Sequence, residues 1–113
     1  MNPLSAILLC CLLEYSISAG LDLAKYRRQL YERHNELRKK HDSPALIVNS
    51  TLEKKAQNYS EYLLKNKKFE HSYGLGRIGE NLYKSTGYTE LNGAAAADDW
   101  YSEIKYYDFN NPK

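Results

Sequence analysis

Cysteine is almost absent from this sequence of 113 residues, and the two that occur, Cys10 and Cys11, are adjacent. Both lie in an apolar run at positions 4–13. The rest of the chain therefore has no disulfide framework of the kind that holds many small secreted domains together. A hydrophobic core must do so instead, and a single domain of this size can build one with little to spare.

A long hydrophobic segment is also missing. The run at positions 4–13 is too short to span a bilayer and has the length of the apolar core of a signal peptide. Small residues at Ser16, Ser18 and Ala19 offer a cleavage point, although no lysine or arginine precedes the run. We predict a signal peptide at residues 1–19 and a mature domain at residues 20–113. An uncleaved anchor and a wrongly assigned first exon are the alternatives.

Acidic residues are scarce in the first half of the chain and basic residues in the second. Residues 25–68 carry twelve Lys and Arg against five Asp and Glu, whereas residues 69–113 carry four against seven. The basic half could attract anionic lipid headgroups, and a solvated helix face is the alternative interpretation. No nucleic-acid-binding motif accompanies the charge, so nucleic acid is not a predicted partner.

Three segments have the pattern of amphipathic helices. The first covers residues 22–40 and ends before Pro44. The second begins with a capping box formed by Ser50 and Glu53 and continues to about Lys68. The third covers residues 89–106. The apolar stripes of the first two are Leu23, Tyr26, Leu30, His34 and Leu37, and then Leu52, Ala56, Tyr59 and Leu63.

Residues 69–79 are rich in glycine and polar side chains, which is typical of a loop. Residues 74–79 match the dinucleotide-binding pattern formally, but the segment before them is too polar to be the buried strand that this fingerprint needs. We expect the glycines to turn the loop tightly and to bring His71 toward Glu80. In the third helix, Glu103 follows Trp100 by three residues, so we expect it to share that face and to point into a cleft.

One imidazole and two carboxylates, from His71, Glu80 and Glu103, are the residue types of a metal or acid–base site. The set is incomplete, because zinc takes three or four ligands and no second histidine follows His71. Two glycosylation sequons also occur. Asn49 lies at a helix entrance, where a glycan could be attached, whereas Asn58 lies within a predicted helix and is the less favourable site.

A set of short motifs spans about residues 24–113. They are, in chain order, His34-Asn35-Glu36-Leu37-Arg38, Pro44-Ala45-Leu46, His71-Ser72, Gly79-Glu80-Asn81-Leu82, Trp100-Tyr101-Ser102-Glu103-Ile104 and Tyr107-Asp108-Phe109. Their order and approximate spacing resemble those of the CAP superfamily, which includes cysteine-rich secretory proteins, venom allergens and plant pathogenesis-related proteins. Without cysteine in its mature part, the chain most resembles the Golgi-associated plant pathogenesis-related subgroup or the venom-allergen-like proteins of parasitic worms.

The resemblance implies an α+β fold, an α-β-α sandwich whose cleft contains two histidines and two glutamates. His71 corresponds to the first histidine, and Glu80 and Glu103 correspond to the glutamates. The second histidine belongs to a Gly-His-Phe-Thr-like motif that would lie beyond Lys113, as would most central strands, so a mostly helical, partial domain is expected. The family's cofactor is zinc or another divalent cation, and with one histidine its binding is expected to be weak.

For function, the resemblance implies a secreted, non-enzymatic binding protein. Its expected partners are lipid or sterol, an anionic membrane surface, and a protein receptor or a second copy of the chain, with roles in host or immune interaction. The expected location is extracellular, with the Golgi membrane as the alternative. Two other functions stay open: a metal-dependent hydrolase-like activity, with His71 as metal ligand or base beside Glu80 or Glu103, and a fragment without function of its own.

Overall fold

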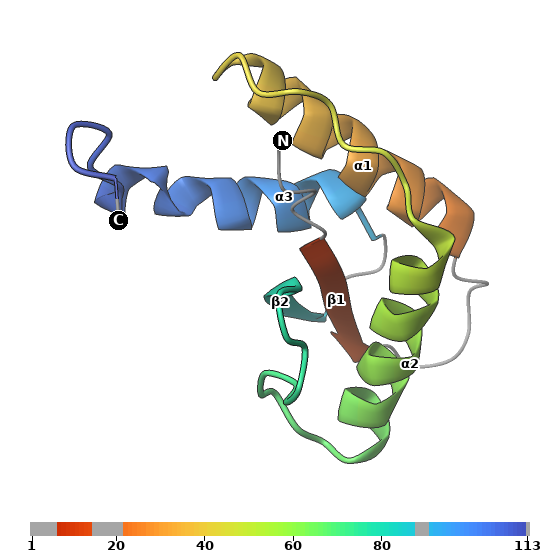
Figure 1. Ribbon diagram of the computed structural model, residues 1–113. Helices are drawn as coiled ribbons and strands as arrows, with labels where there is room; N and C mark the ends of the chain where they lie inside the picture. The colour runs from red at the N-terminus through yellow and green to blue at the C-terminus, as the bar shows by residue number, and fades with distance from the viewer. Residues whose placement is uncertain (1–6, 15–21, 88–90, 113) are drawn as a thin grey trace. The chain divides into compact units, whose positions relative to one another are not determined.

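The chain divides into two compact units, which we call the sheet unit (residues 1–20 and 47–90) and the helical unit (residues 21–46 and 91–113). The computed structural model describes residues 7–14, 22–87 and 91–112. Each unit has buried residues of its own: Ala56 and Leu63 in the sheet unit, and Tyr26, Leu30, Leu37, Ala96 and Ala97 in the helical unit. Figure 1 labels the helices and strands.

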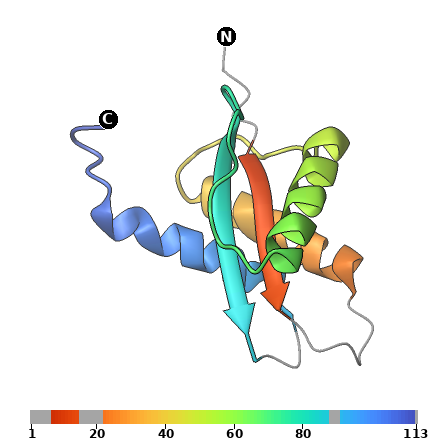
Figure 2. The ribbon, with the colours of Figure 1, turned by 90° about the horizontal axis from the view of Figure 1, so that it is seen from below.

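The sheet unit contains two parallel strands and one helix. Strand β1 (Ile7–Glu14) pairs along its full length with β2 (Gly79–Thr86), and helix α2 (Ser50–Lys65) packs against β1. Figure 2 shows the two strands side by side, with α2 next to β1. Leu63 of α2 is fully buried, and Tyr59 and Leu82 pack around it. A helix covering a short sheet thus forms the core of this unit.

Strand β1 lies within the segment that the sequence predicts to be a signal peptide. The predicted cleavage point at residues 16–19 lies outside the described residues. Cleavage there would remove β1 together with the pairing that β2 makes with it. Cleavage itself stays a prediction. No helix in the described part of the chain is long and apolar enough to cross a membrane.

The helical unit consists of α1 (Leu23–Lys39), α3 (Gly93–Tyr101) and a short 3-10 helix, η1 (Ser102–Tyr106). Asp22 caps α1 by accepting a hydrogen bond from the backbone N–H of Lys25 at 2.9 Å. The predicted apolar stripe of α1 is confirmed, since Tyr26, Leu30 and Leu37 are the buried residues of this helix.

The third predicted helix is shorter than the sequence pattern suggests. We expected one helix over residues 89–106, but α3 begins at Gly93 behind an Asn92 cap and tightens into η1 after Tyr101. Residues 88–90 lie outside the described residues. The Asn92 side chain accepts from the N–H of Ala94 at 2.9 Å, which fixes the helix start later than the alanine-rich pattern alone indicates.

Helices α1 and α3 approach each other closely at Gly93. The N–H of Gly93 donates to the Gln29 side-chain oxygen at 3.2 Å. A Cβ atom at this position would collide with the Tyr26 carbonyl oxygen and would lie 2.8 Å from the Leu30 nitrogen. The absence of a side chain at Gly93 therefore permits this packing.

The capping box predicted at Ser50 is wrong by one residue. Asn49 is the cap of α2, and its Oδ1 accepts from the N–H groups of Thr51 and Leu52, both at 3.1 Å. Ser50 is the first residue of the helix. The side-chain oxygen of a cap reaches the second and third helical N–H groups, and Asn serves this role as well as Ser does. The helix also ends earlier than predicted, at Lys65.

Helices α1 and α2 both end in a turn of the same type. After α2, Lys67 has φ of +52° and the N–H of Lys68 donates to the Leu63 carbonyl at 2.9 Å. After α1, Asp42 has φ of +53° and the N–H of Ser43 donates to the Arg38 carbonyl at 3.1 Å. This is the Schellman arrangement, in which glycine is the favoured residue at the left-handed position.

The combination of helices with a parallel strand pair, within the described residues, confirms the expected α+β character. The α-β-α sandwich that the resemblance implies stays an expectation.

The close contact at Gly93 gives a stability test. We expect Gly93→Ala to lower the free energy of unfolding by about 1–3 kcal/mol or more, because the added methyl group would overlap backbone atoms that cannot move independently. Gly79→Ala is the matched control, since a Cβ there meets no atom within 4 Å. Urea unfolding followed by circular dichroism measures both. Equal stability of the two variants would contradict the packing described for α1 and α3.

Candidate functional site

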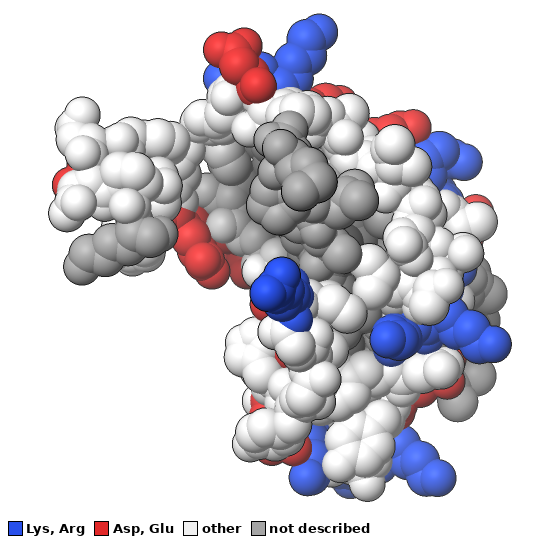
Figure 3. All heavy atoms as spheres, viewed as in Figure 1, with Lys and Arg blue, Asp and Glu red and all other residues white. Residues whose placement is uncertain are grey.

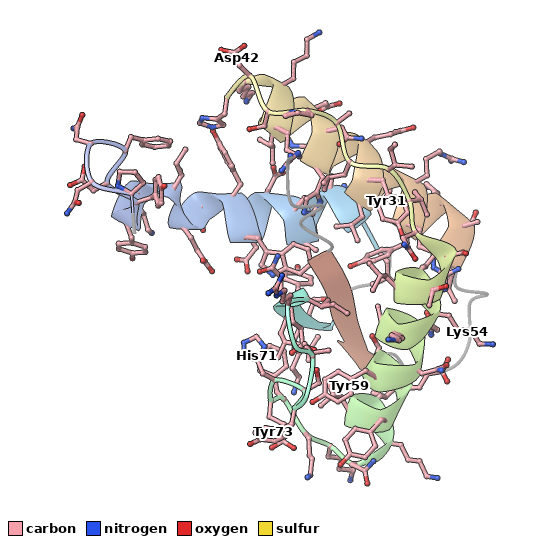
Figure 4. All side chains as sticks on the ribbon, viewed as in Figure 1. Tyr31, Asp42, Lys54, Tyr59, His71 and Tyr73 are labelled. Atoms are coloured by element: carbon pink, nitrogen blue, oxygen red, sulfur yellow. The ribbon has the colours of Figure 1, made fainter. Side chains whose placement is uncertain are left out.

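The sheet unit brings two of the predicted site residues together. His71 lies in the loop between α2 and β2, and Glu80 is the second residue of β2. The His71 Nδ1 atom lies 2.7 Å from the Glu80 Oε1 atom. Two glycines of the loop, Gly74 and Gly76, have φ of +76° and +64°, so the loop turns back as the glycine pattern predicts. Figure 4 shows His71 on this loop beside β2.

Glu80 is held by a second neighbour as well. The backbone N–H of Ser72 donates to Oε1 at 2.9 Å, and the Ser72 hydroxyl donates to Oε2 at 2.6 Å. Together with the hydrogen bond from His71, the Glu80 carboxylate accepts three hydrogen bonds. Its side chain is only 3% exposed, whereas that of His71 is 66% exposed. Glu80 therefore anchors the loop from a nearly buried position.

The pKa of Glu80 results from opposing effects. Burial disfavours the charged form and would raise the pKa, but hydrogen bonds from the Ser72 hydroxyl, the Ser72 N–H and His71 stabilise that form. Together the hydrogen bonds prevail, and the pKa lies below its ordinary value of 4.5. Glu80 is therefore ionised at neutral pH.

The hydrogen bond also defines what His71 can do chemically. When Nδ1 carries the proton that is donated to Glu80, the other ring nitrogen, Nε2, has the lone pair that can accept a proton or bind a metal ion. The Ser72 hydroxyl donates to Glu80 rather than to the imidazole, so the three residues do not have the geometry of a serine activated by a histidine.

The described residues do not by themselves fit a zinc site. Structural zinc sites use four protein ligands and catalytic sites usually three. Within residues 22–87 and 91–112, whose side chains the structure describes, no group of three or more His, Cys, Asp or Glu side chains is placed to hold a metal ion. His71 offers one nitrogen, and the oxygens of Glu80 already accept three hydrogen bonds.

Glu103, the third predicted site residue, belongs to the helical unit. It is exposed in η1, where the helix has already narrowed from the α to the 3-10 form. Trp100 is half-buried in α3 and packs against the His34 ring, with 5.8 Å between ring centroids. The expectation that Glu103 joins His71 and Glu80 in a cleft stays an expectation.

The other two histidines take part in packing contacts of the helical unit. His34 Nδ1 lies 3.0 Å from the Leu30 carbonyl oxygen, and burial of the ring lowers its pKa although this hydrogen bond acts in the opposite direction. His41 Nε2 lies 2.9 Å from the Tyr101 hydroxyl, and its ring stacks on Phe109. Both have the structural surroundings expected of histidines outside a site.

The two sequons differ in their local structure. Asn49 is exposed at the start of α2 and uses only its Oδ1 atom as the helix cap, which leaves the Nδ2 atom as the point of glycan attachment. Asn58 lies inside α2, and the hydroxyl of its sequon partner Ser60 donates to the Ala56 carbonyl at 2.8 Å. Glycosylation therefore stays a prediction in which Asn49 is the better site.

Two residues whose side chains fix the backbone, one in each unit, had no role predicted from the sequence. Ser72 supplies two of the three hydrogen bonds to Glu80, and its position directly after His71 was the available signal. In the helical unit, the Asn35 side chain bonds both backbone groups of Leu46, accepting from its N–H at 2.7 Å and donating to its carbonyl at 3.2 Å. Nothing in the local pattern around Asn35 indicates that contact, because the partners are eleven residues apart.

Comparison with known proteins agrees with this arrangement of motifs. Residues 31–112 match the family described as CAP, the cysteine-rich secretory protein family. The human Golgi-associated plant pathogenesis-related protein 1 is 38% identical over 90 residues, which are 78% of this chain and 57% of the relative. Repressed by EFG1 protein 1 of Candida albicans is 34% identical over 89 residues, 77% of this chain and 31% of the relative. Secreted protein RBT4 of the same yeast is 32% identical over 85 residues, 75% of this chain and 22% of the relative.

The chain therefore belongs to the CAP family, as the motifs predict. It spans about half the length of the human relative and less of the two yeast relatives. No solved structure matches the chain significantly.

The anchoring role of Glu80 can be tested by Glu80→Gln. Glutamine has one acceptor oxygen and an NH₂ group that donates, so at least one donor of His71 or Ser72 loses its acceptor. We expect the free energy of unfolding at neutral pH to fall by about 1–3 kcal/mol. Glu103→Gln, an exposed change, should alter it by less than about 0.5 kcal/mol.

The difference in the free energy of unfolding between the native chain and Glu80→Gln is expected to depend on pH. Because the folded-state pKa of Glu80 is below its unfolded value, the unfolded chain binds the proton more readily, and the stabilisation is lost as pH falls below 4.5 toward the folded-state pKa. The stability difference between the native chain and Glu80→Gln should therefore shrink on acidification. A difference that stays constant from neutral to acid pH would show that the Glu80 charge does not anchor the loop.

Proposed function

We propose that the chain is a secreted, non-enzymatic binding protein of the CAP family that acts at lipid or membrane surfaces. The observation that carries this proposal is the number of large hydrophobic side chains that the described residues of the sheet unit expose. Such side chains favour contact with apolar or interfacial partners when they lie together at a surface. They are Ile47, Val48, Tyr62, Leu64, Phe69 and Tyr73.

Charge and aromatic content support the same function. The excess of Lys and Arg over residues 25–68 favours an anionic surface. Three of the exposed side chains of the sheet unit are aromatic, namely Tyr62, Phe69 and Tyr73, and the chain has eleven tyrosines in all. A tyrosine has an apolar ring and a polar hydroxyl, which suits the boundary between lipid and water.

The geometry of the His71 and Glu80 pair supports binding rather than catalysis. All the hydrogen bonds described for Glu80 come from the loop that it anchors, and Ser72 donates to this carboxylate. A general base or nucleophile must instead face a substrate. A metal-dependent hydrolase-like activity is thus the less favoured alternative, and a fragment without function of its own is another.

The names of the relatives support passage through the secretory pathway. One is described as Golgi-associated and another as secreted. We propose an extracellular location, with attachment to the Golgi membrane as the alternative. A sterol ligand, a protein receptor and a second copy of the chain are further candidate partners.

Vesicle co-sedimentation tests the proposed function. We expect the full chain to sediment with phosphatidylcholine vesicles that contain phosphatidylserine, and the bound fraction to fall as salt is added, because exposed charges are screened. Vesicles of phosphatidylcholine alone, with and without cholesterol, separate the anionic headgroup from sterol as the attractive component. No sedimentation with any of these vesicles at low salt would refute a lipid-binding function.

A second candidate function is weak binding of zinc or another divalent cation. It is supported by the hydrogen bond that His71 donates to Glu80, which orients the exposed imidazole ring. We expect His71→Ala to abolish any zinc signal in isothermal titration calorimetry while the chain stays folded, and His41→Ala to leave that signal intact. Zinc binding that is unchanged in His71→Ala would exclude this residue as a ligand.

A further inference from the structure

Basic and exposed aromatic side chains come together at one end of the sheet unit, in residues 62–73, which we call the basic tip. It contains the end of α2 and the loop that follows. The tip has three lysines and one glutamate, a net charge of +2 when His71 is neutral. Of its large apolar side chains, Phe69 is 52% exposed and Tyr73 is 95% exposed. Tyr62 and Leu64 are exposed on either side of the buried Leu63.

Contacts within the sheet unit make the tip one continuous surface. The Lys68 Nζ atom lies 5.9 Å from the centroid of the Tyr62 ring and 3.1 Å from a carboxylate oxygen of Glu70. Tyr62 stacks on Tyr59, and the Tyr59 hydroxyl donates to the Glu70 carbonyl oxygen at 2.8 Å. The loop is therefore tied to the last turns of α2 rather than standing apart from it.

The far end of the tip is anchored by Glu80. Through His71 and Ser72, this carboxylate fixes the two residues before Tyr73. Figure 4 shows Tyr73 on this loop, with His71 nearby and Tyr59 on the neighbouring helix. The exposed ring thus extends from an anchored backbone, and ordering the loop on binding would require little further loss of entropy.

Lys67 places a further cation at a left-handed backbone position of the tip. It occupies the left-handed position of the Schellman turn with φ of +52°, where a residue with a side chain is disfavoured and glycine would fit best. The fold alone would be served better by glycine. A lysine at this position adds a cation to the end of the tip at a cost in conformational energy.

We propose that the basic tip is the surface through which the chain contacts an anionic lipid bilayer. The lysines would lie among the headgroups, and Phe69 and Tyr73 would enter the interfacial layer, where aromatic rings and lysines are favoured together. Figure 3 shows Lys and Arg atoms beside uncharged atoms at this end of the sheet unit. The inference rests on the membrane-surface function proposed above and assigns that function to particular residues.

The sharpest test is Lys67→Gly with Asp42→Gly as its matched control. Both positions are left-handed residues of equivalent helix-ending turns, so glycine should leave the thermal melting temperature unchanged or higher in each. Losing one lysine near the bilayer is expected to weaken binding to phosphatidylserine-containing vesicles about fivefold. Asp42→Gly lies in the helical unit and should not weaken that binding.

The aromatic contribution is tested by the double variant Phe69→Ser and Tyr73→Ser. Both side chains are exposed, so we expect the fold to persist and vesicle binding to weaken several-fold. Tyr106→Ser is the control, because Tyr106 is 80% exposed but belongs to the helical unit. Binding of this control should equal that of the native chain.

The outcomes separate this inference from the proposed function. Loss of binding in the tip variants, with the two controls unchanged, supports the basic tip as the contact surface. Binding that is unchanged in the tip variants would overturn the inference and leave the proposed membrane function intact. Absence of vesicle binding by the native chain would refute both the proposed membrane function and the basic tip as its contact surface. Binding of the native chain to an acidic polypeptide such as polyglutamate but not to vesicles would overturn the bilayer assignment.

Discussion

The arrangement of the sheet unit around its candidate site depends on one nearly buried carboxylate. An ionised glutamate that is withdrawn from water must receive hydrogen bonds, and Glu80 receives three, all from His71 and Ser72. Because the donors lie eight and nine residues before the acceptor, satisfying the charge closes a loop. The same interaction orients the imidazole, lowers the pKa of Glu80 and fixes the backbone that precedes Tyr73.

This interaction also bears on function. An imidazole beside a carboxylate is a residue pair that can form a metal or acid–base site. In this structure, however, the Glu80 carboxylate accepts its hydrogen bonds from His71 and Ser72 of the loop. The described residues provide too few ligands for zinc, and they expose aromatic and basic side chains on the loop that Glu80 anchors. Our interpretation is that the pair acts first as a structural anchor. The basic tip proposed above includes the loop that this pair holds, and a surface that is already ordered loses less entropy on contact.

The helical unit depends on a different constraint, which is the distance between backbones. Gly93 and the buried Ala96 and Ala97 provide little side-chain volume, so α3 can approach the Tyr26 and Leu30 turn of α1 closely. Asn35 then fixes the chain after α1 by bonding both backbone groups of Leu46, and Arg33 bonds Asp98 at 2.7 Å between the two helices. The ion pair is exposed and adds little stability, whereas the small residues set the geometry.

The amino-acid sequence by itself determined the family, the existence of α1 and α2 and the stripes that they bury, because these depend on local periodicity and on the order of motifs. It also indicated that the glycine-rich loop returns His71 to Glu80. It misplaced the cap of α2, since Asn49 and Ser50 are both good caps and only the backbone geometry selects between them. It also overestimated the length of the third helix, because the alanine-rich pattern does not show that Asn92 caps the helix and fixes its start at Gly93.

Only the tertiary structure decided which groups satisfy one another. The pairing of β1 with β2, the three hydrogen bonds to Glu80, the contact of Asn35 with Leu46 and the left-handed lysine at position 67 all depend on atoms brought together by folding. A sequence shows which side chains can donate, accept or carry charge. Whether a given carboxylate faces a metal ion, a substrate or its own loop depends on distances of a few ångströms between distant residues, and periodicity carries no information about these.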